Sequence, residues 1–222
     1  MNGKDLKRIA MLTMLADHIG FLLIPPEPVY FLLRTIGRLS FPLFCFLLVE
    51  GFFHTGDVKR YGRNLLLFAV ISEIPFNLVC GGSWFFPAYQ NVFFTLFLGL
   101  CMMACLRQVH GEVWSAAVVL LFAAAAWTFQ CDYHALGILM IAFLYRYRTG
   151  SISIAVPAVF AALLSLGNLC AAAISMVFIY FYDGTRGKQG NKYVYYLFYP
   201  IHLLILYLLS GSFGCFLGNF QL

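Results

Sequence analysis

The first two apolar segments of the chain carry charged and titratable side chains in their interior. Asp17 and His18 lie well past the middle of the first segment, and Arg34 and Arg38 share one face of the second. Each such charge costs about 2.5–3.5 kcal/mol on membrane-insertion scales, so these residues are normally kept for pairing or function. His18 is the first candidate for catalysis, because a neutral imidazole is a competent base near pH 7. We expect Asp17 or His18 to contact an arginine of the second segment; the alternative to a functional role is a structural Asp–Arg ion pair.

Several other polar residues fall at a similar depth in later apolar segments. They are Glu73, Gln90, Asn91, Thr95, Asp132, Tyr133, His134 and His202. Each has a structural alternative: Asn91 and Asp132 could be helix caps, and His202 could bond to a backbone carbonyl. Their shared depth favours a polar cavity inside the bundle. We take Glu73, Asn91 and His202 as further candidate catalytic residues.

These side chains must be positioned by membrane helices, because the composition excludes a soluble fold. Apolar residues make up 62% of the 222 residues and charged residues only 10%, with a mean hydropathy of +0.86. A soluble domain carries roughly 25% charged residues. The sequence therefore predicts an all-α polytopic transmembrane helical bundle, formed by a single domain over residues 1–222.

About nine spans are predicted, with eight or ten as alternatives. A helix needs about 20 apolar residues to cross a hydrocarbon core of roughly 30 Å, and glycine- or proline-containing breaks separate the segments. The predicted spans are approximately 5–24, 28–53, 60–80, 91–107, 112–129, 132–147, 151–166, 168–182 and 192–217.

The distribution of Lys and Arg predicts the orientation in the cell membrane. With a cytoplasmic N-terminus, all 14 basic residues except Arg34 and Arg38 fall at the inner face. The net charge of +5 then reflects topology, and no nucleic-acid partner is expected. Glu50 and His54 end the second span beside this basic cluster, either as an interfacial ion pair or at the mouth of a site for an anionic ligand.

The sequence contains few other motifs of known chemistry. We find no P-loop, dinucleotide-binding glycine motif, zinc-protease motif, nucleophile elbow or convincing internal repeat. Cys101 and Cys105 share a helix face without a nearby histidine, so no metal site is expected.

Six strings, in order and across nearly the whole chain, resemble the TraX family, which is named for the conjugative pilin acetylase. They are LKRIAMLTMLADHIG, GRLSFPLFCFLLVEGFFHT, KRYGRNLLLFAVISEIPFNL, QNVFFTL, DYHALGILMI and YYLFYPIHLLIL. GRLSFPLF and SEIPFNL are unusual strings for a membrane helix. The family resembles a broader group of transmembrane acyltransferases, including the lysosomal heparan-α-glucosaminide acetyltransferase. That group shares an early-helix histidine followed by a second helix with a G-R-x-x-F-P-x-F-like pattern.

The resemblance implies transfer of an acetyl group from cytoplasmic acetyl-CoA to an amine or hydroxyl presented at the outer face. His18 matches the essential histidine of the group, Asp17 and Arg38 fall in its motif, and His134 departs from the family pattern. Arg38 or Asn91 would stabilise the developing oxyanion, and an acetyl-histidine intermediate is an alternative route. The candidate contacts for the CoA thioester are Arg34, Lys59, Arg60, Arg63 and Arg186.

Two other classes of function remain open at this stage. Intramembrane Asp, His, Glu and Arg also suit a small proton-coupled transporter, although such transporters usually show paired repeats. A non-catalytic envelope assembly protein would use the same charges for helix packing alone. The acceptor, the acyl length and the oligomeric state are not predicted.

Overall fold

The computed structural model describes residues 1–187 and 192–210, and within them regular secondary structure is helical apart from one isolated bridge between Gln90 and Cys131. The α-helices are α1 (Gly3–Leu23), α2 (Val29–Gly37), α3 (Ser40–His54), α4 (Val58–Gly81), α5 (Val92–Leu106), α6 (Glu112–Thr128), α7 (His134–Arg148), α8 (Ala155–Leu164), α9 (Ser175–Tyr180) and α10 (Lys192–Ser210). Two 3₁₀ turns, η1 (Leu166–Asn168) and η2 (Ala171–Ile174), connect α8 to α9. The prediction of an all-α fold is confirmed for this part of the chain.

The predicted second span, 28–53, is interrupted in the structure. α2 ends at Gly37 and α3 begins at Ser40, with Arg38 and Leu39 in a turn between them. Pro42 explains the position of the break, since its ring has no N–H and clashes with the carbonyl four residues earlier, that of Arg38. The break places Arg38 at a helix end inside the predicted span, and Val29–His54 as a whole is still long and apolar enough to cross a membrane.

The predicted seventh and eighth spans, 151–166 and 168–182, also differ from the structure. α8 has 10 residues, which gives a length of about 15 Å, half of a typical hydrocarbon core. The segment 168–182 contains η2 and the six-residue α9 instead of one helix. Leu169 and Cys170 both have positive φ, which breaks the helix between η1 and η2.

Three segments of the described residues are both long and apolar enough to cross a membrane: Val29–His54, Val58–Gly81 and Tyr193–Ser210. The nine-span count and the orientation stay predictions. Residues 211–217 of the predicted last span, and Lys188 of the basic cluster, lie outside the described residues.

The outer surface of the bundle carries many large apolar side chains. Leu12 is 66% exposed, Trp127 62% and Leu208 69%, while a separate core that includes Leu43 and Ile138 is fully buried. Large apolar side chains on the outside of a well-packed core are typical of a surface that meets lipid. The chain is therefore a helical membrane protein.

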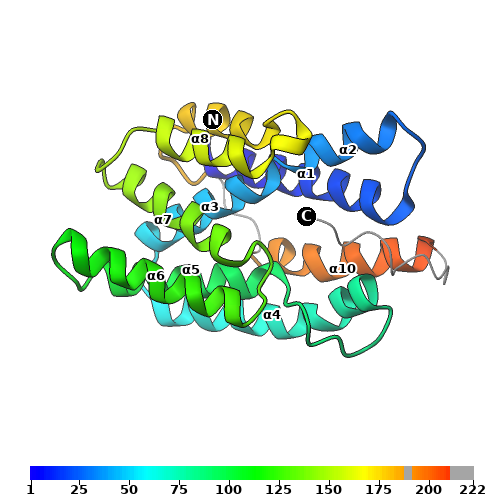
Figure 1. Ribbon diagram of the computed structural model, residues 1–222, viewed down its shortest axis with the longest axis horizontal. Coiled ribbons are helices and arrows are strands. Elements are labelled where there is room, and N and C mark those ends of the chain that lie inside the picture. Colours follow the sequence, from blue (N-terminus) through cyan, green and yellow to red (C-terminus); the bar gives the residue numbers. More distant parts are fainter. Residues whose placement is uncertain (188–191, 211–222) are drawn as a thin grey trace.

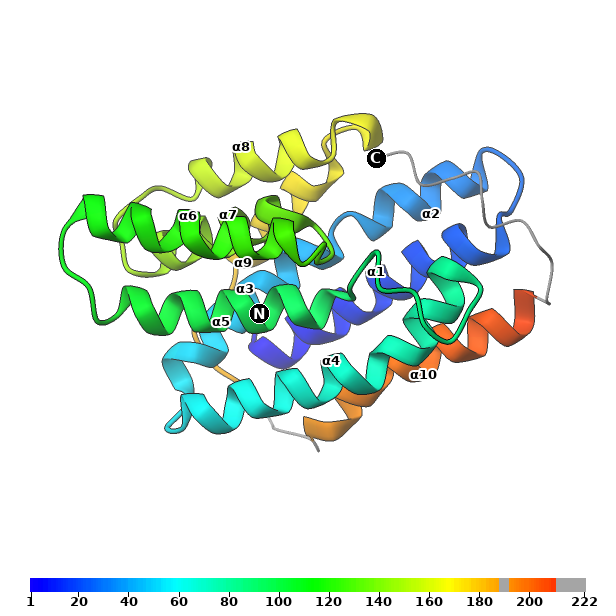
Figure 2. The ribbon, with the colours of Figure 1, turned by 60° about the horizontal axis from the view of Figure 1, so that its bottom comes forward.

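The first described helix, α1, packs against the last, α10. α1 packs against α2, α3 and α10, and α10 also lies along α4 (Figures 1 and 2). α5, α6 and α7 pack together on the other side of α3 and α4 (Figure 2). α1 and α2 approach closely at Gly37, where an added Cβ would stand 2.3 Å from Cβ of Asp17. This contact between helices requires a glycine.

Candidate functional site

One cavity of about 1300 Å³ runs between two groups of polar residues inside the bundle. We call the group formed by Lys7, Arg60 and Arg186 the basic end, and the group formed by Asp17, His18, Arg34, Arg38 and Asp132 the polar end. Both groups line the same cavity. Lys7 and His18 are both on α1, and at 1.5 Å per residue they lie about 16 Å apart along its axis. The cavity therefore extends over roughly half the thickness of a hydrocarbon core.

Asp17 and Arg34 form an ion pair at the polar end. Nη1 of Arg34 donates to Oδ2 of Asp17 at 2.8 Å, and the two side chains are only 20% and 19% exposed. The predicted contact between Asp17 and an arginine of the next helix is thus present. The other carboxylate oxygen of Asp17, Oδ1, is buried and has no hydrogen-bond partner among the described residues. The arginine that pairs with Asp17 is Arg34, a residue predicted from the sequence as a contact for the CoA thioester.

Arg38 lies at the turn between α2 and α3 and faces the cavity. Its Nε donates to Oδ1 of Asn168 at 3.1 Å, which ties it to η1. Within the described residues Arg38 makes no ion pair, so its remaining guanidinium donors are available to a ligand. Asn168 was missed by sequence reasoning, because only the irregular backbone of 166–174 brings it to this position.

His18 and His202 form a pair between the first and the last helix. Nδ1 of His18 and Nε2 of His202 are 2.7 Å apart, and Nδ1 of His202 lies 2.6 Å from the carbonyl oxygen of Phe198. The bond to a carbonyl, considered for His202 from sequence, is present. The pairing of the two histidines is not visible in the sequence, because it depends on the contact between α1 and α10.

The α6–α7 turn closes the polar end with a strained backbone. Gln130, Tyr133 and His134 have positive φ values of 52°, 61° and 43°, and all three line the cavity. The hydroxyl of Tyr89 donates to Oδ1 of Asp132 at 2.9 Å. The ring of Tyr133 stacks on Phe41, with 3.6 Å between the ring centroids. Positive φ at several non-glycine residues is uncommon and is found at functional sites.

Glu73 and Asn91 form a separate contact between α4 and α5. The side-chain amide of Asn91 donates to Oε1 of Glu73 at 2.5 Å and to the carbonyl of Ala69 at 2.8 Å, while its Oδ1 caps α5 at Phe93. Neither residue is part of the cavity wall within the described residues. The amide of Asn91 is used in these two bonds, and Glu73 does not contact His18 within the described residues; the predicted catalytic roles of both residues stay predictions.

The basic end contains only part of the predicted set for the CoA thioester. Arg60 and Arg186 line the cavity, and so does Lys7, which the sequence analysis did not include. Nζ of Lys7 stands 5.1 Å from the centroid of the Tyr195 ring. Lys59 and Arg63 are exposed and are not part of the cavity wall in the described region. Helical periodicity explains this, because α4 lines the cavity through Arg60, Tyr61, Asn64 and Leu65, and Arg60 is at the edge of that face. Lys59 and Arg63 lie beyond that edge.

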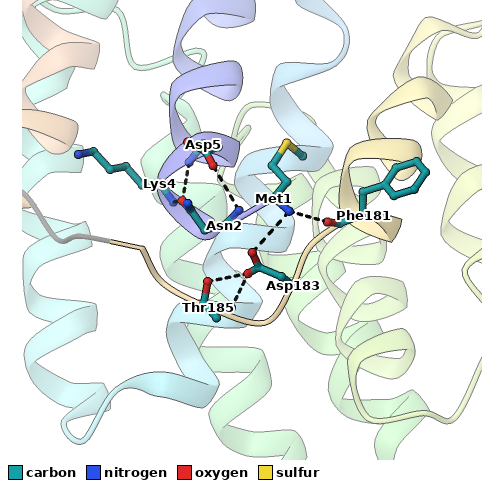
Figure 3. A network of polar contacts seen from close by, with 7 residues as sticks. All are labelled: Met1, Asn2, Lys4, Asp5, Phe181, Asp183 and Thr185. Carbon is teal, nitrogen blue, oxygen red and sulfur yellow. Dashed lines mark hydrogen bonds and ion pairs between the residues drawn. The ribbon is translucent and has the colours of Figure 1, made fainter.

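A polar network fixes the segment that carries Arg186 (Figure 3). Its contacts connect the start of α1 with residues 181–185. The N–H of Gly3 donates to the carbonyl of Thr185 at 2.8 Å. The hydroxyl and N–H of Thr185 both donate to Asp183, at 2.6 and 2.8 Å, and lower the pKa of that carboxyl. The network places the basic side chain of Arg186 beside α1.

Glu50 also lines the cavity, and its carboxylate is already bonded to another side chain of the protein. Its carboxylate accepts from Nε of Arg148, and Nδ1 of His54 is 2.8 Å from its carbonyl oxygen. The interfacial ion-pair interpretation of Glu50 is therefore supported. In the described part of the chain, no group of three or more His, Cys, Asp or Glu is arranged to hold a metal.

Comparison with known proteins gives a family match over almost the whole described chain. The model of the family described as "TraX protein" matches residues 2–210. A curated relative, "Probable fimbrial assembly protein FimC, serogroup H1" of Dichelobacter nodosus, is 33% identical over an alignment that covers 91% of this chain and 93% of the relative. No solved structure matches. By the extent of the family match and the identity to this relative, the chain belongs to the TraX protein family.

Proposed function

We propose that this protein is a membrane-embedded acetyltransferase that moves an acetyl group from acetyl-CoA to an amine or hydroxyl of an acceptor at the opposite face of the cell membrane. The observation that carries the proposal is the single cavity that joins the basic end to His18. Basic side chains suit the phosphates of CoA, and an accessible histidine suits proton transfer. The family resemblance found in the sequence supports the same reaction.

In the proposed complex the nucleotide part of acetyl-CoA binds at the basic end, and the pantetheine arm lies along the cavity. Lys7, Arg60 and Arg186 come from α1, α4 and the α9–α10 connection, so three separate segments bring positive charge to the cavity wall. The thioester then reaches the level of His18, about 16 Å away along α1. Arg34 lies at the polar end of the cavity and away from the nucleotide part of acetyl-CoA, because its guanidinium pairs with Asp17.

At the polar end, His18 removes the proton of the acceptor nitrogen or oxygen as that atom attacks the thioester carbonyl. The C–N or C–O bond forms, the C–S bond breaks, and the proton passes from His18 to the departing thiolate sulfur. Arg38 stabilises the negative charge on the carbonyl oxygen, since its guanidinium has one hydrogen bond, to Asn168, within the described residues. Asp17 neutralises Arg34 and takes no part in the proton transfer.

The proposed orientation has the basic end and the N-terminus in the cytoplasm and about nine passes through the cell membrane. This follows the distribution of Lys and Arg, of which only Arg34 and Arg38 lie at the polar end. CoA is a large polyanion that does not cross a bilayer, whereas a cavity of about 16 Å would bring its reactive end to about the middle of the hydrocarbon core. The bilayer, acyl-CoA and an extracytoplasmic acceptor are the proposed partners.

A fimbrial subunit or another envelope component is the proposed acceptor, because the relative from Dichelobacter nodosus carries the name of a probable fimbrial assembly protein. The same name favours a second candidate, a non-catalytic assembly function. The two differ in what they require of His18, since an assembly protein needs the histidine only for packing. Fimbrial assembly in cells that carry His18→Ala would separate them.

Calorimetry with acetyl-CoA tests the proposal on the purified protein. The wild type is expected to show saturable binding, and His18→Ala is expected to bind with a similar dissociation constant, since binding depends on the basic end. Free CoA serves as the control for the contribution of the acetyl group. A folded wild-type protein that binds neither compound would exclude the acetyltransferase and favour a proton-coupled transporter.

A further inference from the structure

The hydrogen bonds of the histidine pair assign a proton to each imidazole. The carbonyl oxygen of Phe198 only accepts, so Nδ1 of His202, at 2.6 Å, must carry a hydrogen. A neutral imidazole has one N–H, which leaves Nε2 of His202 as an acceptor. Nδ1 of His18, at 2.7 Å from that atom, must then be the donor. Nε2 of His18 is therefore the atom without a proton.

The opposite assignment would need a buried cation. If Nε2 of His202 donated to His18, both nitrogens of His202 would carry protons and the ring would be positive. His202 is only 6% exposed, and within the described residues it contacts no carboxylate. Burying an unpaired charge is costly, so the neutral arrangement is favoured.

His18 is the member of the histidine pair that lines the cavity. Within the described part of the chain, the cavity wall includes His18 but not His202. Nδ1 of His18 is occupied by His202, and within the described residues Nε2 of His18 makes no hydrogen bond. Because His18 lines the cavity and its Nδ1 is used by His202, Nε2 is the nitrogen that remains to act as a general base toward an acceptor in the cavity.

We infer that His202 is a positioning residue that fixes His18 in the tautomer competent to act as a base. The inference rests on the proposed function, in which His18 takes the proton of the acceptor. His202 is itself held by stacking, with 4.7 Å between its ring centroid and that of Phe198. An imidazolium that forms on His18 would keep its Nδ1–H bond to His202, which stabilises the charge.

The pair does not conduct protons away from the site. The chain of hydrogen bonds ends at the carbonyl of Phe198, which has no proton to release. The proton taken by His18 must therefore leave through Nε2 into the cavity, where the departing thiolate is the acceptor. His202 thus differs from a relay residue, and its replacement should change the orientation of His18 without closing a proton path.

Substitutions at His202 separate positioning from packing. His202→Leu removes both hydrogen bonds and is expected to lower acetyl-CoA turnover about 100-fold, with the half-saturating concentration unchanged. His202→Gln keeps an oxygen that accepts from His18 and an amide that donates to Phe198, so it should recover about tenfold of that loss. The exposed His110→Leu is the matched control and should turn over as the wild type does. Equal turnover of His202→Leu and wild type would contradict the inference.

Nitrogen NMR of ¹⁵N-histidine-labelled protein reads the tautomer without any need for activity. The wild type is expected to show His18 with a protonated Nδ1 and a bare Nε2, assigned by loss of the signals in His18→Gln. In His202→Leu the two tautomers of His18 should mix. A protonated Nε2 in the wild type would overturn the inference. A bare Nε2 in a protein that consumes no acetyl-CoA would instead reject the proposed function and leave the fixed tautomer standing.

Discussion

At the polar end of the cavity the titratable side chains contact protein groups, whereas at the basic end Lys7 and Arg60 make no ion pair within the described residues. Asp17 pairs with Arg34, His18 with His202, and Arg38 bonds to Asn168. Nζ of Lys7 lies over the face of the Tyr195 ring, 5.1 Å from its centroid. One end is preorganised, and the other offers positive charge.

The difference matches two different tasks. Catalytic groups must be held in fixed geometry before the substrate arrives, so hydrogen-bonded pairs suit the polar end. A phosphate-bearing ligand needs cations whose charge is not already neutralised, so Lys7 and Arg60, which make no ion pair within the described residues, suit the basic end. Substitutions at the polar end should therefore change turnover or stability, and those at the basic end should change affinity.

His18→Ala should have the largest effect. Loss of the proposed general base is expected to lower acetyl-CoA turnover about 10³-fold, because general-base catalysis contributes roughly 10²–10⁴-fold. Thioester consumption followed by chromatography of free CoA measures it, and calorimetric binding of acetyl-CoA should be unchanged. Retention of most of the turnover by His18→Ala would remove His18 from the mechanism.

Arg34→Leu should mainly affect stability. The substitution leaves the carboxylate of Asp17 unpaired in a site where it is 20% exposed, and we expect a loss of about 2–3 kcal/mol in the free energy of unfolding. Thermal unfolding in detergent reports the change. The double variant Asp17→Asn/Arg34→Leu contains no unpaired charge and should be more stable than Arg34→Leu; an equal loss in both would show that the ion pair is not the cause.

Neutralising the basic end should weaken binding alone. Lys7→Gln, Arg60→Gln and Arg186→Gln are each expected to raise the dissociation constant of acetyl-CoA about tenfold, which corresponds to about 1.4 kcal/mol. Lys59→Gln and Arg63→Gln remove the same charge outside the cavity wall and are the matched controls. If the controls weakened binding as much as the cavity variants, general surface charge would explain the affinity.

The smallest effect is expected at the network that holds Arg186. Hydrogen bonds from Thr185 lower the pKa of Asp183 below its usual value of 3.8. The contribution of Asp183 to the free energy of unfolding is therefore complete above pH 3.8, and it is lost as the pH falls through the lower pKa of the folded state. Melting temperatures between pH 5 and about pH 2 should fall less for Asp183→Asn than for the wild type. Parallel curves for the two proteins would assign the acid sensitivity to other groups.

The sequence predicted those features that depend on local pattern. Helices occupy most of the predicted spans, and Asp17 meets an arginine of the next helix as the spacing of the two segments suggested. It could not predict the His18–His202 pair or the Arg38–Asn168 bond, because both depend on packing between distant segments. It also grouped Lys59 and Arg63 with Arg60, since charge at one membrane face does not reveal which side chains point to a cavity.

The central claim is that acetyl-CoA spans the cavity with its acyl group at His18, and photolabelling tests it most directly. An acyl-CoA analogue with a photoreactive acyl group is bound in the dark, irradiated and mapped by mass spectrometry, with excess free CoA as competitor. The account predicts labelling of the peptides that contain His18 and Tyr199, which line the cavity at that level. Labelling confined to peptides around Arg60 and Arg186, or labelling that free CoA does not reduce, would contradict it.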